Sequence, residues 1–179
     1  LGDRLLKISP EGKVKKIAEG FSRCFDVKLD NKGNIYVADD KVDIIYKFSP
    51  SMKKTIYYKG KLTGDFILTS LAFDKKFENL YAREGNKIIK FKINPNGSQS
   101  KPVCIANKEF IFNICIDNNN NIYGCTTTPK QKIDKKGKIT ILADLLVDPD
   151  GFCIGKTGFN QNTLYVTEAN GIVKVKLGK

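Results

Sequence analysis

The 179-residue sequence has no histidine and no tryptophan, and only three of its 31 basic residues are arginine. Without histidine, neither a Ser-His-Asp nor a Cys-His nucleophile can be assembled, and zinc sites that need histidine are excluded as well. Glycine-rich phosphate-binding loops are also missing from the sequence. General acid–base chemistry would therefore fall to carboxylates or to a metal-bound water.

The scarcity of arginine decides how the net charge of +12 is interpreted. Arginine is the residue that makes bidentate contacts to phosphates and guanine edges. The lysines are scattered along the whole chain and form no basic cluster of the kind that marks a nucleic-acid site. We interpret them as the solvent-facing residues of strands, and we do not expect nucleic acid as a partner.

Long apolar runs and cysteine pairs are lacking too. No stretch approaches the ~18 consecutive apolar residues of a membrane helix, so no membrane span is expected. The five cysteines include no CxxC pair, and their odd number excludes complete pairing within one chain. Cys115 and Cys153 lie in apolar runs, which favours reduced core thiols. One disulfide involving Cys104, Cys125 or Cys24 stays open.

The chain starts at Leu1 without a charged and then apolar leader, so we expect a processed form or a part of a longer protein. For the compartment, we favour an extracellular protein over a cytoplasmic one and leave the question open.

The sequence contains one seven-residue motif, the repeated phrase, four times. It reads "NIYVADD" from Asn34, "NLYAREG" from Asn79, "NIYGCTT" from Asn121 and "TLYVTEA" from Thr163. Its tyrosines lie 45, 42 and 42 residues apart, at Tyr36, Tyr81, Tyr123 and Tyr165. A period in the low forties is typical of four-stranded propeller blades. We expect the four tyrosines to pack between blades.

The residues on either side of each phrase support the same fold. A short apolar stretch comes before it, followed by a turn rich in Asn, Gly and Lys. An alternating strand follows the phrase, with lysines on the side expected to face solvent, and then a fourth strand. Helix periodicity is nowhere sustained. The sequence therefore predicts an all-β fold, a β-propeller of four-stranded blades.

The predicted strands group into a series of blades within one domain, residues 1–179. Residues 1–20 supply the two outer strands of a blade, three full blades follow, and the last blade is incomplete, giving 17 strands. The predicted full blades span 21–60, 66–106 and 110–144, and the incomplete one spans 148–179. Either "VKKIAEG" closes a four-bladed ring by completing the last blade, or the chain is part of a five- or six-bladed propeller, which we favour.

The last unit, with "PDG" before an apolar strand and then "NTLYVTEA", resembles the SMP-30/gluconolactonase/luciferin-regenerating-enzyme family of six-bladed propellers. "LDNKGNIYVAD" is also similar to NHL-type and strictosidine-synthase-like repeats. The resemblance covers most of the chain as a repeat pattern and is specific in detail only from Asp148 onward. It implies a divalent cation in the central channel, held by a Glu of the opening blade and by Asn and Asp residues at innermost strands.

Two of those ligands have counterparts here. The Asp of the family's "PDG" falls on Asp150, and its Asn falls on Asn113, which the family follows with Gly and this chain with Ile114. The opening-blade Glu has no counterpart in this sequence. The resemblance thus implies that Asp150 is both a metal ligand and the catalytic carboxylate of a lactonase.

The residues alone point to the same end of the blades. Short polar side chains lead into the four innermost strands, and the turns after the second strands open on the same face. The first set is Asp26, Ser70, Asn113 and Asp150; the second is Asp39, Asp40, Glu84, Glu168 and Asn170. We expect this face to be locally acidic. Oxygen ligands of this kind suit Ca²⁺ or Mg²⁺.

The predicted metal ligands are Asp150, Asn113 and Asp26, and the predicted ligand-binding residues are Ser70, Asp39, Glu84 and Glu168. Two other interpretations stay open for the first set. These residues can be ordinary turn residues that bond nearby backbone N–H groups, or they can bind a ligand directly without a metal. For Asp39, Asp40 and Glu84 of the second set, we favour solvated turn residues.

Three functions follow. The first is a divalent-metal-dependent hydrolase that acts on a small lactone or ester at the central channel. The second is a non-catalytic propeller that binds a small apolar ligand, as the pigment carriers whose repeats are similar do, or a protein partner on its top face. The third is a repeat scaffold with protein partners only.

Overall fold

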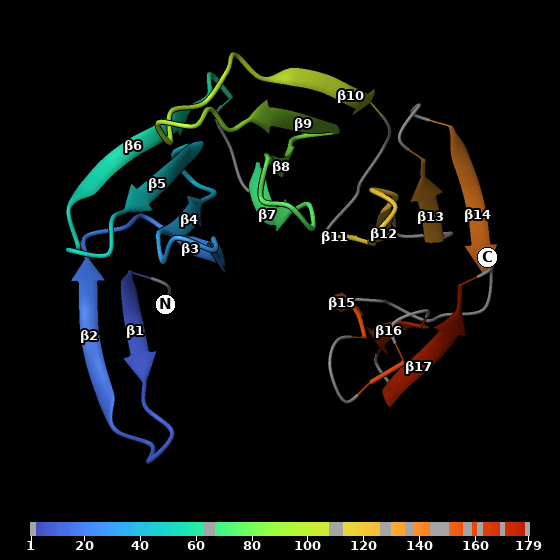
Figure 1. Cartoon of the computed structure of the whole chain (residues 1–179), viewed down its shortest axis with the longest axis horizontal. Helices are drawn as coiled ribbons and strands as arrows, with labels where there is room; N and C mark the ends of the chain where they lie inside the picture. Colours follow the sequence, from blue (N-terminus) through green and yellow to red (C-terminus); the bar gives the residue numbers. More distant parts are fainter. Residues whose placement is uncertain are drawn as a thin grey trace. The chain divides into compact units, whose positions relative to one another are not determined.

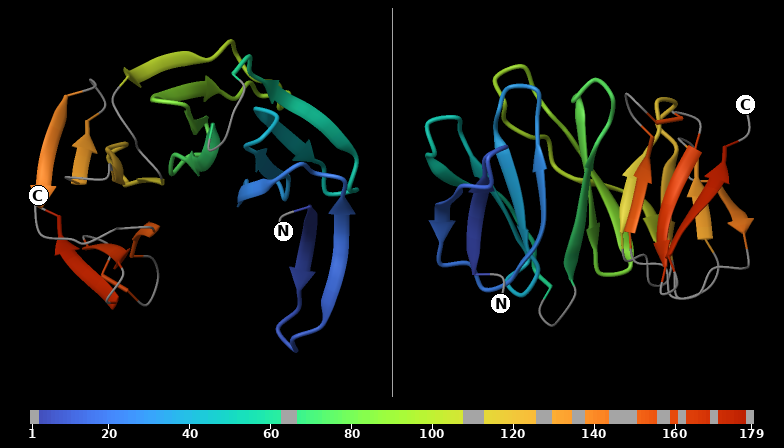
Figure 2. Two further views of the ribbon diagram at one scale, coloured as in Figure 1. Left: turned by 180° about the vertical axis from the view of Figure 1, so that it is seen from behind. Right: turned by 90° about the horizontal axis from the view of Figure 1, so that it is seen from below.

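The structure is a computed structural model, and it describes residues 3–62, 67–107, 113–125, 130–134, 138–143, 151–155, 159–160, 163–168 and 171–177. Within these ranges there are 17 β-strands and no helix. The strands form antiparallel sheets of two, four, four, four and three strands, each in simple sequential order. Figures 1 and 2 show the sheets as successive blades whose strands run alternately up and down. The predicted all-β propeller fold is confirmed, as are the strand number and its distribution over the sheets.

Contacts divide the chain into two compact units, Leu1–Ser70 and Leu71–Lys179, with the division inside β7. The first unit holds the two-stranded sheet and the first full blade, which lie side by side in Figure 1. Their strands are β1 (Arg4–Ile8), β2 (Val14–Glu19), β3 (Cys24–Leu29), β4 (Ile35–Asp39), β5 (Ile44–Phe48) and β6 (Lys54–Lys59). The single domain expected over residues 1–179 stays a prediction.

The second unit holds the other blades, apart from the first part of β7 up to Ser70. The next blade consists of β7 (Leu68–Phe73), β8 (Asn79–Glu84), β9 (Lys87–Lys92) and β10 (Val103–Asn107). The blade after it consists of β11 (Ile114–Ile116), β12 (Ile122–Cys125), β13 (Lys130–Ile133) and β14 (Ile139–Ala143). The last consists of β15 (Gly151–Ile154), β16 (Thr163–Glu168) and β17 (Gly171–Lys176).

The repeated phrase marks a hydrogen-bonded clamp at the turn between the two innermost strands. In the first blade, Asp30 Oδ1 accepts the backbone N–H groups of Lys32 and Asn34 at 2.9 and 2.8 Å. Asp30 Oδ2 accepts the side-chain amide of Asn34 at 2.7 Å and the hydroxyl of Tyr36 at 3.3 Å. Short polar side chains readily close turns in this way. The Asn and Tyr of the phrase thus both bond to one half-buried carboxylate.

The next two blades repeat the clamp around Asp74 and Asp117. Each carboxylate accepts two backbone N–H groups and the amide of Asn79 or Asn121. The third residue after each aspartate has a positive φ, and it is Gly33, Phe77 or Asn120. Phe77 adopts a φ of 56° there, a conformation that is strained for a bulky residue.

The core of the second unit lies between its blades. Tyr81 and Ile88 of one blade pack against Ile114, Ile122 and Ile133 of the next, and all five are at most 5% exposed. The following interface contains Tyr123, which packs with Leu164 and Val166. The expected packing of Tyr81 and Tyr123 between blades is confirmed.

Several expectations about exposure were wrong. The third strand of a blade was expected to bury one face only, but the neighbours Ile88 and Ile89 of β9 are both buried, so both faces are covered. Neighbouring residues of a strand point to opposite faces, and a blade inside a stack is covered on both. Cys153, expected in the core, is exposed, and Cys24 and Cys104 are free thiols.

The closure of a four-bladed ring by "VKKIAEG" stays a prediction. The strand β2, which contains these residues, pairs with β1 along its length. The last blade is a three-stranded sheet in which β17 follows β16. Sequence proximity decided this pairing, because β1 and β2 form a hairpin closed by the turn Ser9–Lys13.

Candidate functional site

The polar residues of the innermost strands occupy one register in three blades. Counted back from the aspartate of each clamp, Asp26, Ser70 and Asn113 each stand four residues before it. The sequence analysis expected all of them to precede the strands. Instead, Asp26 and Ser70 lie within β3 and β7, and Asn113 directly precedes β11.

The last blade departs from this register. Gly155 holds the place of the clamp aspartate, because its N–H donates to the carbonyl of Thr163 at 3.1 Å, as the N–H of Asp30 does to Asn34 at 3.0 Å. The residue four positions before Gly155 is Gly151, so Asp150 is one place out of register with the other three. A shift of one residue along a strand changes the face on which a side chain lies. Asp150 itself lies outside the described residues.

Asp26 has partners of its own in the first blade. Its Oδ1 accepts the ammonium of Lys28 at 2.5 Å and the N–H of Val27 at 2.7 Å, and its side chain is 16% exposed. A carboxylate that is already paired with a lysine ammonium attracts a metal ion less strongly. The sequence analysis missed Lys28, although its place two residues along the same strand puts it on the same face.

Ser70 and Asn113 differ in burial. Ser70 is 1% exposed in the middle of β7, and Asn113 is half-buried at the start of β11. They belong to the first and second compact units, respectively, so each is described within its own blade. Both side chains can donate and accept hydrogen bonds, which distinguishes them from the apolar residues around them.

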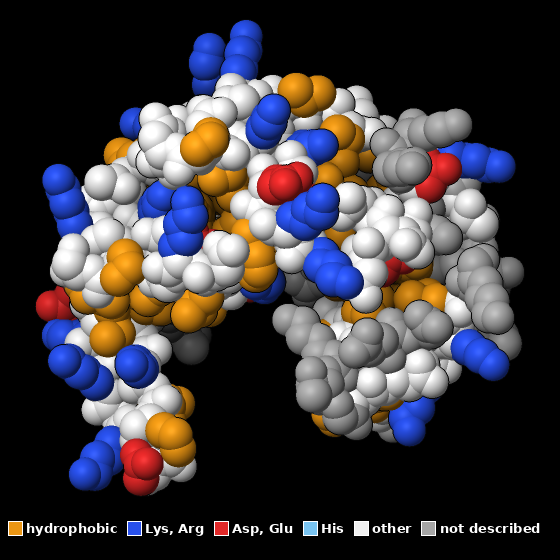
Figure 3. Space-filling model, viewed as in Figure 1, with side chains coloured by type: hydrophobic (Ala, Val, Ile, Leu, Met, Phe, Trp, Pro, Cys, Tyr) orange, Lys and Arg blue, Asp and Glu red, His pale blue; other side chains and the backbone are white. Residues whose placement is uncertain are grey.

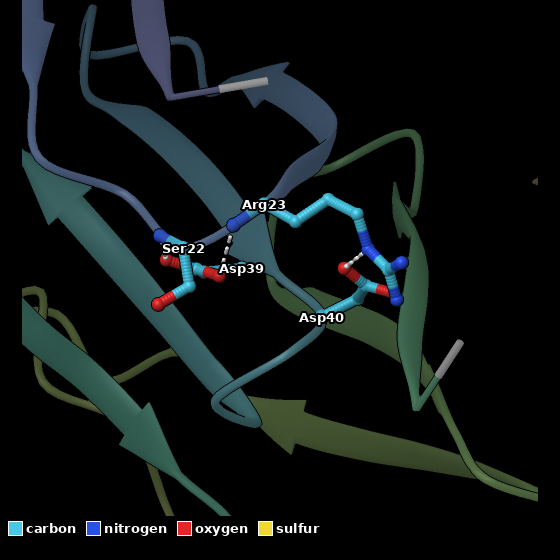
Figure 4. Close-up of polar contacts among 4 residues, drawn as sticks. All are labelled: Ser22, Arg23, Asp39 and Asp40. Atoms are coloured by element: carbon cyan, nitrogen blue, oxygen red, sulfur yellow. Dashed lines mark hydrogen bonds and ion pairs between the residues drawn. The ribbon is translucent and has the colours of Figure 1, made fainter. Parts of the chain in front are cut away.

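The end of β4 holds a closely bonded polar cluster. The carboxylate of Asp39 accepts the N–H of Ser22 at 2.8 Å and the N–H of Arg23 at 2.9 Å. The neighbouring Asp40 receives two bonds from the guanidinium of Arg23, both at 2.7 Å. Figure 4 shows the two carboxylates on either side of Arg23. The cluster ties the end of β4 to the segment that leads into β3.

The interpretation of Asp39 and Asp40 as solvated turn residues was wrong, because both side chains are completely buried. Burial of a carboxylate requires charge pairing and hydrogen bonds, and Arg23 and the backbone supply them. Sequence reasoning did not assign a role to Arg23. The signal that could have found it is its rarity, since it is one of three arginines among many lysines.

The other residues of the second set lie at the ends of second strands, as expected. Glu84 ends β8 and is 8% exposed, so it too is buried, and Glu168 ends β16 and is half-buried. Asn170 lies outside the described residues. Their use as ligand-binding residues stays a prediction.

Close to the Asp39 cluster, burial raises the pKa of the Cys24 thiol to about 12, with the negative charge of Asp39 as the second cause. Burial also raises the pKa of Tyr46, to which Asp39 adds. Both groups are therefore neutral at physiological pH and offer no nucleophilic anion.

Among the described residues, no group of three or more Asp, Glu, Cys or His side chains is placed to hold a metal ion. In the same part of the chain, no helix is both long and apolar enough to cross a membrane. The described carboxylates Asp26, Asp39 and Asp40 bond to lysine, arginine and backbone N–H groups. The described residues thus do not by themselves fit a divalent cation.

Comparison with known proteins places the fold. No family model and no curated protein matches the sequence. Among solved structures, a gluconolactonase from Xanthomonas campestris superposes with a TM-score of 0.79 at 13% identity, over 97% of this chain and 64% of that one. A luciferin-regenerating enzyme gives 0.76 at 15% identity, over 99% and 72%. A structure of a nidogen/laminin complex gives 0.76 at 15% identity, over 94% and 65%.

These likenesses show a shared β-propeller fold, in agreement with the repeat pattern of the sequence. The chain spans about two thirds of the length of each of these structures, between 64% and 72%. At 13–15% identity, activity and ligand do not follow from the fold.

Proposed function

We propose that the chain belongs to a propeller that hydrolyses a small lactone or ester at the innermost strands. The observation that supports this is the row of oxygen-bearing side chains at one register, Asp26, Ser70 and Asn113, in a chain whose fold matches a gluconolactonase. Innermost strands surround the centre of a propeller, where a small ligand can meet several blades at once.

The proposed chemistry needs two roles. A carboxylate must take a proton from the attacking water, and hydrogen-bond donors must stabilise the negative charge that develops on the carbonyl oxygen. We assign the first role to Asp150 and the second to the amide of Asn113 and the hydroxyl of Ser70. Asp26, already bonded to Lys28, would orient the ligand.

A divalent cation such as Ca²⁺ or Mg²⁺, with Asp150, Asn113 and Asp26 as ligands, is the second part of the hypothesis. When bound, such an ion would supply a Lewis acid for the carbonyl oxygen. Because the described residues do not complete its coordination, the binding of the ion is tested separately.

The experiment is a hydrolysis screen with a panel of lactones and aryl esters on the wild-type chain and two matched variants. Asp150→Asn removes the proposed base and should lower kcat/KM by at least about 10²-fold. Asp148→Asn removes a carboxylate two residues away in the same segment and should leave kcat/KM within about twofold. Equal effects of the two variants, or no hydrolysis of any substrate, would overturn the proposal.

The cation is tested by thermal unfolding in EDTA and then in ~1 mM Ca²⁺ or Mg²⁺. An ion present at ~100 times its dissociation constant should add about 2.7 kcal/mol, a shift of several degrees, and Asp150→Asn should abolish it. Hydrolysis without any shift would keep the hydrolase and reject the metal.

A non-catalytic binding propeller is the second candidate. The observation that favours it is that the carboxylates of Asp26, Asp39 and Asp40 are already bonded to Lys28, Arg23 and the N–H of Ser22. One matched propeller was solved in a nidogen/laminin complex. Thermal stabilisation by a small apolar ligand or a protein, together with an inactive hydrolysis screen, would favour this candidate.

A further inference from the structure

The connection between β9 and β10 contains a modification motif that the proposed function does not use. Asn96-Gly97-Ser98 is the only Asn-x-Ser/Thr triplet of the 179-residue sequence. Such triplets are the acceptors of N-linked glycans, which are attached to the side-chain amide of the asparagine. Because so short a motif is common by chance, the geometry around Asn96 decides its meaning.

The triplet lies at the tip of a tight hairpin turn. The N–H of Asn94 donates to the carbonyl of Ser98 at 2.8 Å, and the N–H of Gly97 donates to the carbonyl of Asn94 at 2.8 Å. Gly97 has a φ of 80°, a left-handed conformation that glycine adopts without steric cost. Asn96 and Ser98 are both exposed, and Figure 2 shows the turn projecting at one end of its blade.

The side chains of the triplet are hydrogen-bonded to each other. The hydroxyl of Ser98 donates to Asn96 Oδ1 at 2.8 Å, and the N–H of Ser98 donates to the same oxygen at 3.0 Å. The amide of Asn94 in turn donates to Ser98 Oγ at 2.9 Å. These partners are two or four residues apart in the chain, so the turn can form before the rest of the blade folds.

This arrangement holds the oxygen of the Asn96 amide and leaves its nitrogen accessible. Within the described ranges of the chain, both hydrogen bonds of the Asn96 side chain are made by Oδ1 and none by Nδ2. Two donors on the oxygen draw electron density away from the amide, which makes its N–H more acidic. The nitrogen is thus placed to lose a proton and form a new bond.

The surroundings of the turn leave room for a large polar group. Pro95 is exposed, as are Lys92 before the turn and Lys101 after it. Figure 3 shows basic side chains projecting around β9 and β10. These are the two outer strands of their blade, so a group attached here lies away from the innermost strands and the proposed site.

We propose that Asn96 carries an N-linked glycan, and that the chain therefore enters the secretory route, in line with the extracellular location favoured from the sequence. The donor is an oligosaccharide on a lipid pyrophosphate. A bond forms between Asn96 Nδ2 and the anomeric carbon of the first sugar. The bond from this carbon to the pyrophosphate oxygen breaks, the lipid pyrophosphate leaves with the electron pair, and a base of the transferase takes the amide proton.

The test is the mass of the protein isolated from its natural source, before and after treatment with an amidase that removes Asn-linked glycans. We expect a series of masses that differ by sugar units and that the amidase reduces to one. The amidase converts the linked asparagine to aspartate, so treatment in heavy-oxygen water labels it. Peptide mass spectrometry should find the label at Asn96, which distinguishes the glycan from spontaneous loss of ammonia at the Asn-Gly pair.

Variants expressed through the secretory route of a eukaryotic cell separate the triplet from the rest of the turn. Asn96→Gln and Ser98→Ala should each lower the glycosylated fraction at least about 10-fold, whereas Ser98→Thr should keep it. Asn94→Gln, at the other asparagine of the turn, is the matched control and should keep it as well. Asn96→Gln changes an exposed residue and should shift the thermal midpoint by less than about 2 °C.

Either of two results would contradict the glycan at Asn96. The first is a natural protein whose mass does not change with the amidase beyond the unlabelled control. The second is an amidase-sensitive glycan that persists in Asn96→Gln, since the attachment would then lie elsewhere.

Discussion

The first full blade, β3–β6, and the last one, β15–β17, close the same turn by different means. In the first, the carboxylate of Asp30 gathers two backbone N–H groups, the amide of Asn34 and the hydroxyl of Tyr36. In the last, Gly155 and Thr163 occupy the places of Asp30 and Asn34, and the bond from N–H to carbonyl remains. Both blades keep the backbone hydrogen bond that closes the turn. The side-chain clamp of Asp30 is therefore one of two ways to support this bond.

The last blade replaces the clamp by close packing. A Cβ added to Gly155 would lie 2.2 Å from the carbonyl oxygen of Asn160 and 3.2 Å from the ring of Tyr165. The Tyr165 ring in turn meets Phe159 edge-on at a centroid distance of 5.7 Å. Glycine is needed here because the backbone of the longer turn passes directly over it.

A second difference concerns the ion pair of Arg23 and Asp40 in the first blade. The position of Asp39 is held in the last blade by Glu168, and that of Asp40 by Ala169. Arg23 is 30% exposed, while Asp40 is fully buried. Breaking this pair should therefore have the largest effect of the substitutions below.

Arg23→Ala should destabilise the chain by about 3–5 kcal/mol, because it leaves the buried Asp40 carboxylate without its cation. Urea unfolding measures the loss. Arg23→Ala combined with Asp40→Ala removes both charges and should restore part of the stability. A double variant no more stable than the single one would show that the buried charge is not the cause.

Gly155→Ala should destabilise the last blade by about 2–3 kcal/mol, since the new methyl group meets backbone that cannot move independently. Gly151→Ala is the matched control. Its methyl group would meet Thr167 Oγ1 at 2.8 Å, the end of a side chain that can rotate, so we expect a smaller loss. An equal loss in both would mean that the close approach at Gly155 is not decisive.

Asp30→Ala should cost about 2 kcal/mol, because two backbone N–H groups, an amide and a hydroxyl lose their common acceptor. Asp30→Asn keeps one acceptor oxygen and should cost less. Thr163→Ala, at the equivalent of Asn34 in the last blade, should cost under about 1 kcal/mol, since the bonds there are made by its backbone. Similar values for Asp30→Ala and Thr163→Ala would remove the distinction between the two turns.

The smallest effect is expected from pH. In the first unit, burial raises the pKa of Tyr36 and Tyr57, with Asp30 as a further cause, and that of Cys24 to about 12. A raised pKa favours the protonated form in the folded state, so stability is complete below the ordinary pKa values of about 9 for the thiol and 10 for the phenols and falls as the pH rises above them.

Urea midpoints measured between pH 8 and pH 11 should therefore decrease, and Cys24→Ser should make the decrease smaller. At pH 8, a thiol reagent should modify the exposed Cys104 and Cys153 much faster than Cys24. Midpoints that stay constant over this range would contradict the assigned burial of these groups.

The sequence by itself determined the strands, their order and the turns of this protein. Alternation at period two and turn residues at fixed offsets are local signals, and their recurrence every 42–45 residues multiplies the evidence for one blade. The site was predicted only as a set of positions. Asp26, Ser70 and Asn113 were predicted as residues that lead into innermost strands, and all three lie four residues before the clamp aspartate.

Only the tertiary structure decided which side chains are buried and with which groups they form hydrogen bonds. Asp39 and Asp40 look like solvated turn residues until Arg23 and the backbone of Ser22 are brought against them from 16 or 17 positions earlier in the chain. Val27 and Ile114 occupy equivalent positions of the repeat, yet Val27 is 42% exposed and Ile114 is 4% exposed. Local patterns fix the conformation of a strand, whereas burial depends on which other strands cover it, and that contact is non-local.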